Sequence, residues 1–199
     1  GCAQACAGVA RYSWHEIAAR RTVDIGLITN ATFGDSMKAA YESRTMQAFG
    51  ELGWRLGTSS FGFEPFANVA HVALETDGFK EDGGAAALTV EATKTSTSFT
   101  TLGVRLSSVF GLGSVQTTAR GTVGWRHAFG DTSPLSTHRF ATGDAFTVAG
   151  APIAQDAAVF DAGLDFQVSP TGTLGLFYSG QYAAGASENG LNARLNLKF

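Results

Sequence analysis

Apolar and polar residues alternate along eight segments of this 199-residue chain, and this pattern constrains the fold more than any other feature. It is clearest in the last segment, where every second residue is apolar: Leu191, Ala193, Leu195, Leu197 and Phe199. Successive side chains of a β-strand point to opposite faces of the sheet, so the alternation predicts strands with one apolar and one polar face. The other segments lie at residues 10–15, 46–55, 63–69, 101–107, 115–129, 159–168 and 173–182. We predict an all-β, antiparallel protein with eight strands.

The connections between these segments differ in length in a regular order. Long connections at residues 18–40, 77–95 and 131–157 alternate with tight turns at 57–60, 111–114 and 169–172, and the final connection, 184–189, is moderate. Outer-membrane barrels have short periplasmic turns and long extracellular loops. A soluble sandwich has no reason to keep its short turns at one end. The order of lengths therefore favours an antiparallel transmembrane β-barrel.

The composition agrees with a barrel that crosses the membrane with strands. Only 16% of the residues are charged, whereas soluble domains average about 25%. No apolar stretch reaches the ~20 residues that a membrane-spanning helix needs. The net charge of −3 gives no basic surface for nucleic acid. We expect outer-membrane lipid as a partner and no nucleic acid.

The polar face of the predicted strands carries both signs of charge, interleaved with Gly and Phe. In a membrane barrel the apolar face meets lipid and the polar face is enclosed. We therefore predict a set of lumen-lining residues: Glu51, Arg55, Glu64, Asn68, Arg105, Arg120, Arg126, Asp161, Asp165 and Arg194. These charges either line a translocation path, hold a linker helix or set ion conductance, or they only compensate one another across strands. Both interpretations stay open.

Aromatic residues gather at the two ends of the predicted strands. Those at the end with tight turns are Trp54, Phe61, Phe63, Phe110 and Phe199, and those at the other end are Tyr12, Trp14, Trp125, Phe129 and Tyr182. Amphipathic rings favour the two membrane–water interfaces. Two belts therefore indicate the two surfaces of a bilayer.

Several stretches resemble a known family. The C-terminal GLNARLNLKF resembles the signal by which the β-barrel assembly machinery recognises bacterial outer-membrane proteins, with Leu191, Ala193, Leu195, Leu197 and Phe199 as its alternating positions. Five internal phrases resemble the autotransporter β-domain of type V secretion: YSWHEI, SRTMQAFGELGWR, FEPFANVAHVALETDGFKEDGGAAAL, ARGTVGWRHAFGD and FTVAGAPIAQDAAVFDAGLDFQVSP. Together they extend over nearly the whole chain.

The resemblance implies a translocator in the outer membrane of a Gram-negative bacterium. Such a domain exports or anchors a covalently linked N-terminal passenger, needs no cofactor and is not an enzyme. Its partners during biogenesis are the assembly machinery and periplasmic chaperones. Family barrels have twelve strands and a helical linker in the lumen, whereas eight strands are visible here. We expect residues 1–199 to be the C-terminal two-thirds of that domain, without passenger, linker helix and first strands.

Two other interpretations remain. The eight strands could close a small barrel whose interior is filled by side chains. Its long loops would then carry a structural or adhesive role. A soluble all-β binding protein is a third and weaker alternative, because it leaves the order of connection lengths unexplained.

Other motifs give no site. The sequence Gly34–Met37 is similar to the nucleophile block of GDSL-type esterases, but no DxxH follows, so a turn is expected. The histidines His15, His71, His127 and His138 lack zinc-site spacing. We interpret 111–114 as a periplasmic turn, and the acidic residues 75–82 as a solvated loop. Cys2 and Cys6 are interpreted as incidental thiols or a local disulfide. We predict no catalytic, cofactor-binding or metal-binding residue.

Overall fold

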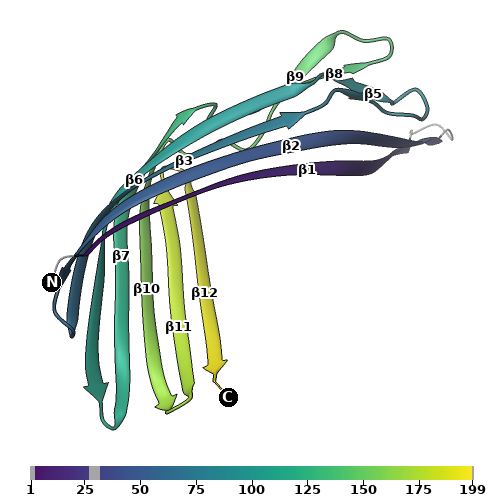
Figure 1. The fold of residues 1–199 in the computed structure, drawn as a ribbon. Coiled ribbons are helices and arrows are strands. Elements are labelled where there is room, and N and C mark those ends of the chain that lie inside the picture. The colour runs from purple at the N-terminus through teal and green to yellow at the C-terminus, as the bar shows by residue number, and fades with distance from the viewer. Residues whose placement is uncertain (1–2, 27–31, 199) are drawn as a thin grey trace.

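A computed structural model describes residues 3–26 and 32–198 as an open, strongly curled antiparallel sheet of eight strands (Figure 1). The strands pair in the order β1-β2-β3-β6-β7-β10-β11-β12. Their bounds are β1 Ala3–Gly26, β2 Thr32–Gly57, β3 Phe61–Thr76, β6 Thr93–Leu112, β7 Val115–Gly130, β10 Asp156–Ser169, β11 Gly172–Ala183 and β12 Ala186–Leu197. The all-β, antiparallel fold class with eight main strands is confirmed.

A second, four-stranded sheet is formed inside two of the long connections. Its strands are β4 Phe79–Lys80, β5 Leu88–Val90, β8 Leu135–Phe140 and β9 Ala145–Ala149, paired in that order. It joins the main sheet at β2, because Lys38 and Asp82 form an antiparallel bridge. The small sheet therefore widens the wall of the curl beyond the upper ends of β3 and β6 (Figure 1).

Two predicted connections are wrong. Residues 18–40 belong mostly to β1 and β2, which pair without interruption from Ala3 opposite Arg55 to Gly26 opposite Thr32. Polar residues occupy both faces of this hairpin there, so the period-two signal disappears from the sequence although the strands continue. The last connection is a tight turn, since Ala183 pairs with Ala186.

The sheet ends at two edges. In the described part of the chain, β1 and β12 pair only with β2 and β11 respectively, and no ladder joins them. The alternative of a small barrel closed by these eight strands is therefore wrong for this structure. An unpaired edge cannot stand in hydrocarbon, where each free backbone group costs several kcal/mol.

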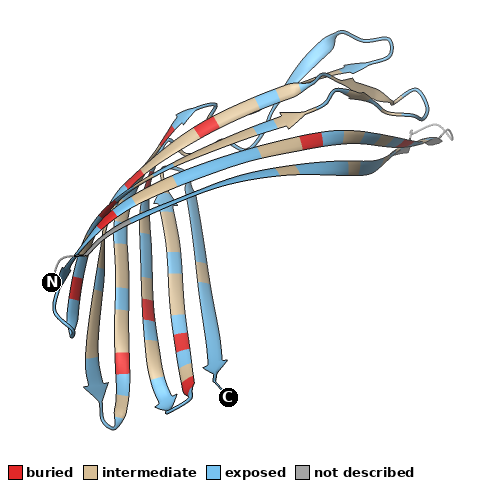
Figure 2. Ribbon diagram, viewed as in Figure 1, coloured by how far each residue is buried: buried red, intermediate tan, exposed pale blue. Residues whose placement is uncertain are grey.

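The register places the alternating apolar residues of the eight strands on one face, while a few rings such as Phe66 and Phe177 lie on the other. Directly paired residues share a face, and Leu174 pairs with Leu195 while Leu176 pairs with Leu164 and Ala193. The opposite face is concave, because Glu51 of β2 and Glu188 of β12 line the same cavity. Apolar side chains on the convex face are widely exposed, Leu191 by 80% (Figure 2).

The strand connections at the lower end are tight. Leu112 pairs with Val115, so Gly113 and Ser114 alone form the turn, and Gly113 has a φ of +63° that favours glycine. This confirms residues 111–114 as a turn. No helix among the described residues is long and apolar enough to cross a membrane.

Candidate functional site: the concave face and its extension

An ion-pair cluster joins three strands on the concave face. The guanidinium of Arg105 on β6 donates to both carboxylate oxygens of Glu51 on β2, at 2.7 and 2.8 Å, and to Glu64 on β3 at 2.9 Å. The same guanidinium lies 4.0 Å from the centre of the Phe66 ring. Two carboxylates and an aromatic face therefore fix one arginine across the width of β3. We call Arg105, Glu51, Glu64 and Phe66 the arginine cluster.

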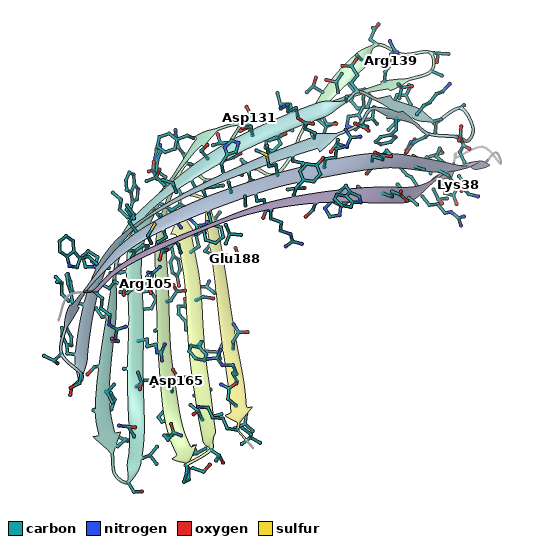
Figure 3. The ribbon with its side chains drawn as sticks, viewed as in Figure 1. Lys38, Arg105, Asp131, Arg139, Asp165 and Glu188 are labelled. Atoms are coloured by element: carbon teal, nitrogen blue, oxygen red, sulfur yellow. The ribbon has the colours of Figure 1, made fainter. Side chains whose placement is uncertain are left out.

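Further arginines follow the same face toward β12. Arg126 donates to Gln181 at 2.7 Å, and Arg120 lies 3.4 Å from Asp165. Arg194 stacks over the Phe177 ring at 5.0 Å. The partners of Arg120 and Arg194 lie on neighbouring strands, whereas Arg126 reaches across β10 to Gln181 on β11. Charged and polar side chains thus follow this face from Arg105 to Asp165 and on toward β12 (Figure 3).

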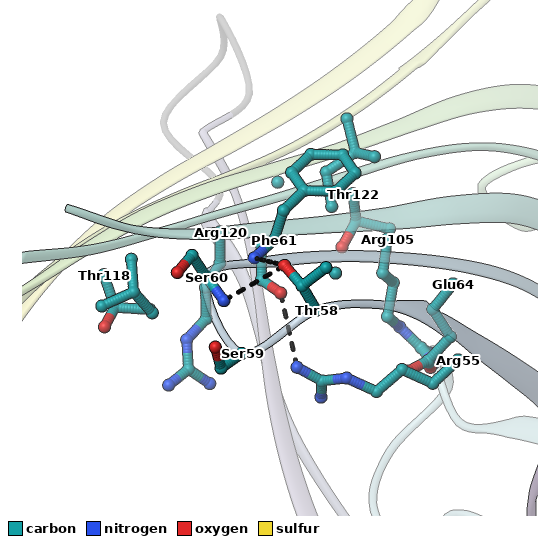
Figure 4. Close-up of a pocket in the computed structure, with 15 residues that line it drawn as sticks. Arg55, Thr58, Ser59, Ser60, Phe61, Glu64, Arg105, Thr118, Arg120 and Thr122 are labelled. Carbon is teal, nitrogen blue, oxygen red and sulfur yellow. Dashed lines mark hydrogen bonds and ion pairs between the residues drawn. The ribbon is translucent and has the colours of Figure 1, made fainter. Parts of the chain in front are cut away.

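Several cavities lie along this face, and two of them adjoin the arginine cluster. One of about 410 Å³ is next to the 57–61 turn and is lined by Arg55, Glu64, Arg105 and Arg120 (Figure 4). Another of about 470 Å³ lies above it, between the arginine cluster and β12, and includes Asp161 in its lining. Polar side chains dominate both linings, which suits water or a solvated chain rather than an apolar ligand.

All ten predicted lumen residues lie on the concave face. The register pairs Glu51 with Asn68, Asn68 with Thr101, and Thr101 with Arg126, and the same parity holds for the rest. Their role in lining a translocation path stays a prediction. Among the described residues no three His, Cys, Asp or Glu side chains gather as a metal site would require.

The upper part of the β1–β2 hairpin stands outside the lipid. Below Trp14 its convex face is apolar, whereas above it the same face carries Glu16, Arg20, Lys38 and Glu42. Charges on the lipid side of a barrel are costly at depth but not beyond the interface. These residues therefore mark an extracellular extension, which we define as residues 15–26 and 32–43 together with the four-stranded sheet.

The loop between β4 and β5 is fastened to this extension. Arg21 of β1 donates to both oxygens of Glu81, at 3.1 and 2.5 Å, and to the carbonyl of Ala86 at 2.8 Å. The Asp35 carboxylate accepts from the backbone N–H groups of Gly84 and Ala86, both at 3.0 Å. The hydrogen bonds from Arg21 hold the pKa of Glu81 below its ordinary value. These contacts form a latch between strand and loop.

The latch covers an apolar side chain. Met37 of β2 is fully buried beneath the loop, and Tyr41 stacks on Phe79 with ring centres 4.1 Å apart. The prediction of a turn at Gly34–Met37 is wrong, because these residues lie inside β2. Asp35 and Met37 have structural roles here, while Ser36 is exposed on the other face. Their partners are some 50 residues away in the sequence, so no local sequence pattern predicts these contacts.

The remaining motifs have structural partners. In the acidic stretch 75–82, Glu75 pairs with Lys94 at 2.5 Å and Glu81 with Arg21, so the expectation of a merely solvated loop is wrong for these two. His127 and Trp125 both contact the Asp156 carboxylate, at 2.7 and 2.9 Å.

The structure describes only some of the residues in the predictions made for the two chain ends. Cys6 is exposed on the convex face. Cys2 and Phe199 lie outside the described residues, so the local disulfide and the terminal position of the assembly signal stay predictions.

Comparison with known proteins agrees with this geometry. The model of the autotransporter β-domain family matches residues 5–179. Two curated relatives, each called extracellular serine protease and both from Serratia marcescens, are 34% identical over 189 residues. The match covers 94% of this chain but only 18% of each relative.

A curled sheet with an apolar convex face and a charged concave face is the wall of an outer-membrane β-barrel. The chain belongs to the autotransporter β-domain family. It is therefore an outer-membrane translocator of type V secretion in a Gram-negative bacterium, and the resemblance found in the sequence is confirmed.

Proposed function

We propose that this chain forms most of the wall through which a secreted passenger of the same polypeptide reaches the cell surface. The observation that carries the proposal is the charged concave face, continuous from β2 to β12 and backed by an apolar convex face. Lipid solvates the outside, and the enclosed ionic face keeps a hydrated path for an unfolded chain.

The wall is completed in this proposal by strands that pair with the free edges of β1 and β12. An eight-stranded barrel has an interior filled by side chains, whereas more strands leave room for a polypeptide. The domain is accordingly the larger part of a barrel. Within the arginine cluster the carboxylates of Glu51 and Glu64 both pair with Arg105, so a passing segment meets ions that already have partners.

The passenger is proposed to be a secreted enzyme. Both relatives are called extracellular serine protease, and this chain corresponds to 18% of their length. Peptide-bond hydrolysis then belongs to the passenger, and the 199 residues act in transport and anchoring without catalysis.

The terminal strand is proposed to be the handle for assembly. Leu191, Leu195 and Leu197 of β12 are exposed by 80, 60 and 58% on the convex face. Together with Ala193 and Phe199 they form the alternating pattern of the assembly signal. Periplasmic chaperones and the β-barrel assembly machinery are the partners that this pattern implies.

The test uses the whole protein in a Gram-negative host. Substituting Glu51→Gln together with Glu64→Gln removes two of the carboxylates that neutralise Arg105, so we expect slower appearance of passenger at the surface with unchanged membrane insertion. Glu16→Gln together with Glu42→Gln, which removes two carboxylates from the convex face of the extension, is the matched control. Export that never depends on this β-domain, seen as surface passenger after its deletion, would overturn the proposal.

A further inference from the structure

A row of apolar side chains crosses the extracellular extension on its concave face. Tyr41 stacks on Phe79, and the register pairs Phe79 with Val90, Val90 with His138, and His138 with Phe146. His138 and Phe146 stack with ring centres 5.6 Å apart. We call these five residues the aromatic row. It joins strands β2, β4, β5, β8 and β9, and sequence analysis gave no sign of it.

One end of the aromatic row is exposed to solvent on the concave side of the wall. Phe146 is exposed by 39%, and Phe140 and Val148 beside it by 39 and 46%. The opposite face of the same strands carries Lys80, Thr89, Arg139 and Thr147, as a surface in water should. The apolar side is therefore turned inward although it lies above the membrane. An apolar patch that water reaches is typical of an interaction site.

The Nδ1 atom of His138, in the middle of the aromatic row, is buried and has no hydrogen-bond partner within the described chain. Buried polar atoms in proteins nearly always have a partner. Because this atom is also closed to solvent, an occupant of the row would contact the exposed rings rather than this nitrogen.

We propose that the aromatic row binds an extended segment of the passenger as it leaves the barrel. The row lies on the same face as the arginine cluster, farther along β2, so a chain moving along the concave face meets it next. The match covers only 18% of each relative, and under the proposed function the rest of such a polypeptide includes the passenger that moves past this point. Aromatic rings give an unfolded chain large, shallow contacts that do not require one sequence. The inference rests on the proposed function.

Site-specific crosslinking in the whole protein tests the contact. A photoreactive benzoylphenylalanine replaces Phe146, or Thr147 as the matched control on the opposite face, and the passenger is stalled in transit by a folded reporter domain. We expect adducts with the passenger from position 146 and none from 147. Equal adducts from both positions, no adducts, or adducts only with a second barrel chain or lipopolysaccharide would overturn the inference.

Export kinetics give an independent reading. The double variant Phe140→Ser and Phe146→Ser should release passenger severalfold more slowly, whereas Thr147→Ser should not, with equal amounts of heat-modifiable barrel. Unchanged kinetics in the double variant would overturn the inference alone. A wild-type protein that inserts but exports nothing would instead overturn the proposed function.

Discussion

The first and last hairpins of the sheet have the same antiparallel pairing but different surroundings. Strands β1 and β2 have 24 and 26 residues, whereas β11 and β12 have 12 each. At about 3.3 Å per residue, β1 is about 80 Å long and β12 about 40 Å. A bilayer needs only about ten residues of a tilted strand. The short hairpin is therefore nearly all membrane, and the long one is half extracellular.

The two hairpins are also stabilised differently. In the short hairpin the convex face meets lipid, and the concave face is packed by Phe177 over Gly163 and Gly175. In the long hairpin the upper half has water on its convex face, and the latch and Met37 hold its concave face. A membrane strand thus needs only a paired neighbour and an apolar side, whereas the extracellular strand needs tertiary contacts of its own.

The largest effect is expected at the terminal strand. Leu195→Lys places a charge in the alternating pattern of β12, so most of the protein should fail to reach the membrane. The amount of surface-protease-protected, membrane-inserted protein measures this, and Asn196→Lys on the other face is the control. Equal yields for the two variants would contradict the role of the alternating positions.

The second-largest effect is expected from a new charge in the middle of β10, in the part of the sheet that has short strands. Leu164→Lys faces lipid and should cost about 2–4 kcal/mol, while Asp161→Lys on the concave face should cost much less. Urea titration of the refolded barrel in lipid vesicles compares their free energies of unfolding. A loss for Asp161→Lys as large as that for Leu164→Lys, or larger, would contradict this assignment of the two faces.

A substitution in the extracellular extension should lower the local stability of the extension and leave the stability of the rest of the sheet unchanged. Met37→Ala leaves a cavity beneath the loop, so the extension should lose about 2 kcal/mol or more of local stability. Hydrogen exchange over residues 34–43 should speed up while β10–β12 keep their protection. The control is Ser36→Ala on the exposed face. Faster exchange in β10–β12 as well would mean that the two regions unfold as one unit.

The packing of Phe177 gives a smaller effect on the short side. A Cβ atom at Gly175 would lie 2.5 Å from the Phe177 ring, whereas one at Gly121 has no neighbour closer than 3.8 Å. Gly175→Ala should therefore cost about 1–3 kcal/mol from overpacking, and Gly121→Ala almost nothing. Thermal unfolding in detergent micelles separates the two. Equal melting temperatures would show that the ring moves aside freely.

The smallest effect is the pH dependence of the latch. The folded pKa of Glu81 is lowered by Arg21, so the latch contributes its stability above the ordinary value of 4.5 and loses it as the pH falls through the lowered pKa. Limited proteolysis of the extension should therefore accelerate only at pH below 4.5. In Glu81→Gln the rate should already be raised at pH 7 and should change less with pH. A wild-type rate that rises at neutral pH would point to another group.

The sequence by itself determined the membrane-spanning part of this protein. In segments such as 159–168 and 191–199 one face meets hydrocarbon, and this solvent requires an apolar residue at every second position whatever the neighbours are. The strands, their faces and the family could therefore be predicted. The same alternation places Glu51, Arg105 and Asp165 on the face opposite the lipid.

Only the tertiary structure decided the rest. Above the membrane the convex face of β1 and β2 meets water instead of lipid, so the alternation ends while the strands continue. Their stability comes from Arg21, Asp35 and Met37, whose partners lie some 50 to 60 residues away. The arginine cluster and the aromatic row likewise depend on which strands lie side by side. Pairing between distant strands leaves no periodic trace in one sequence, because each contact is specified by two segments at once.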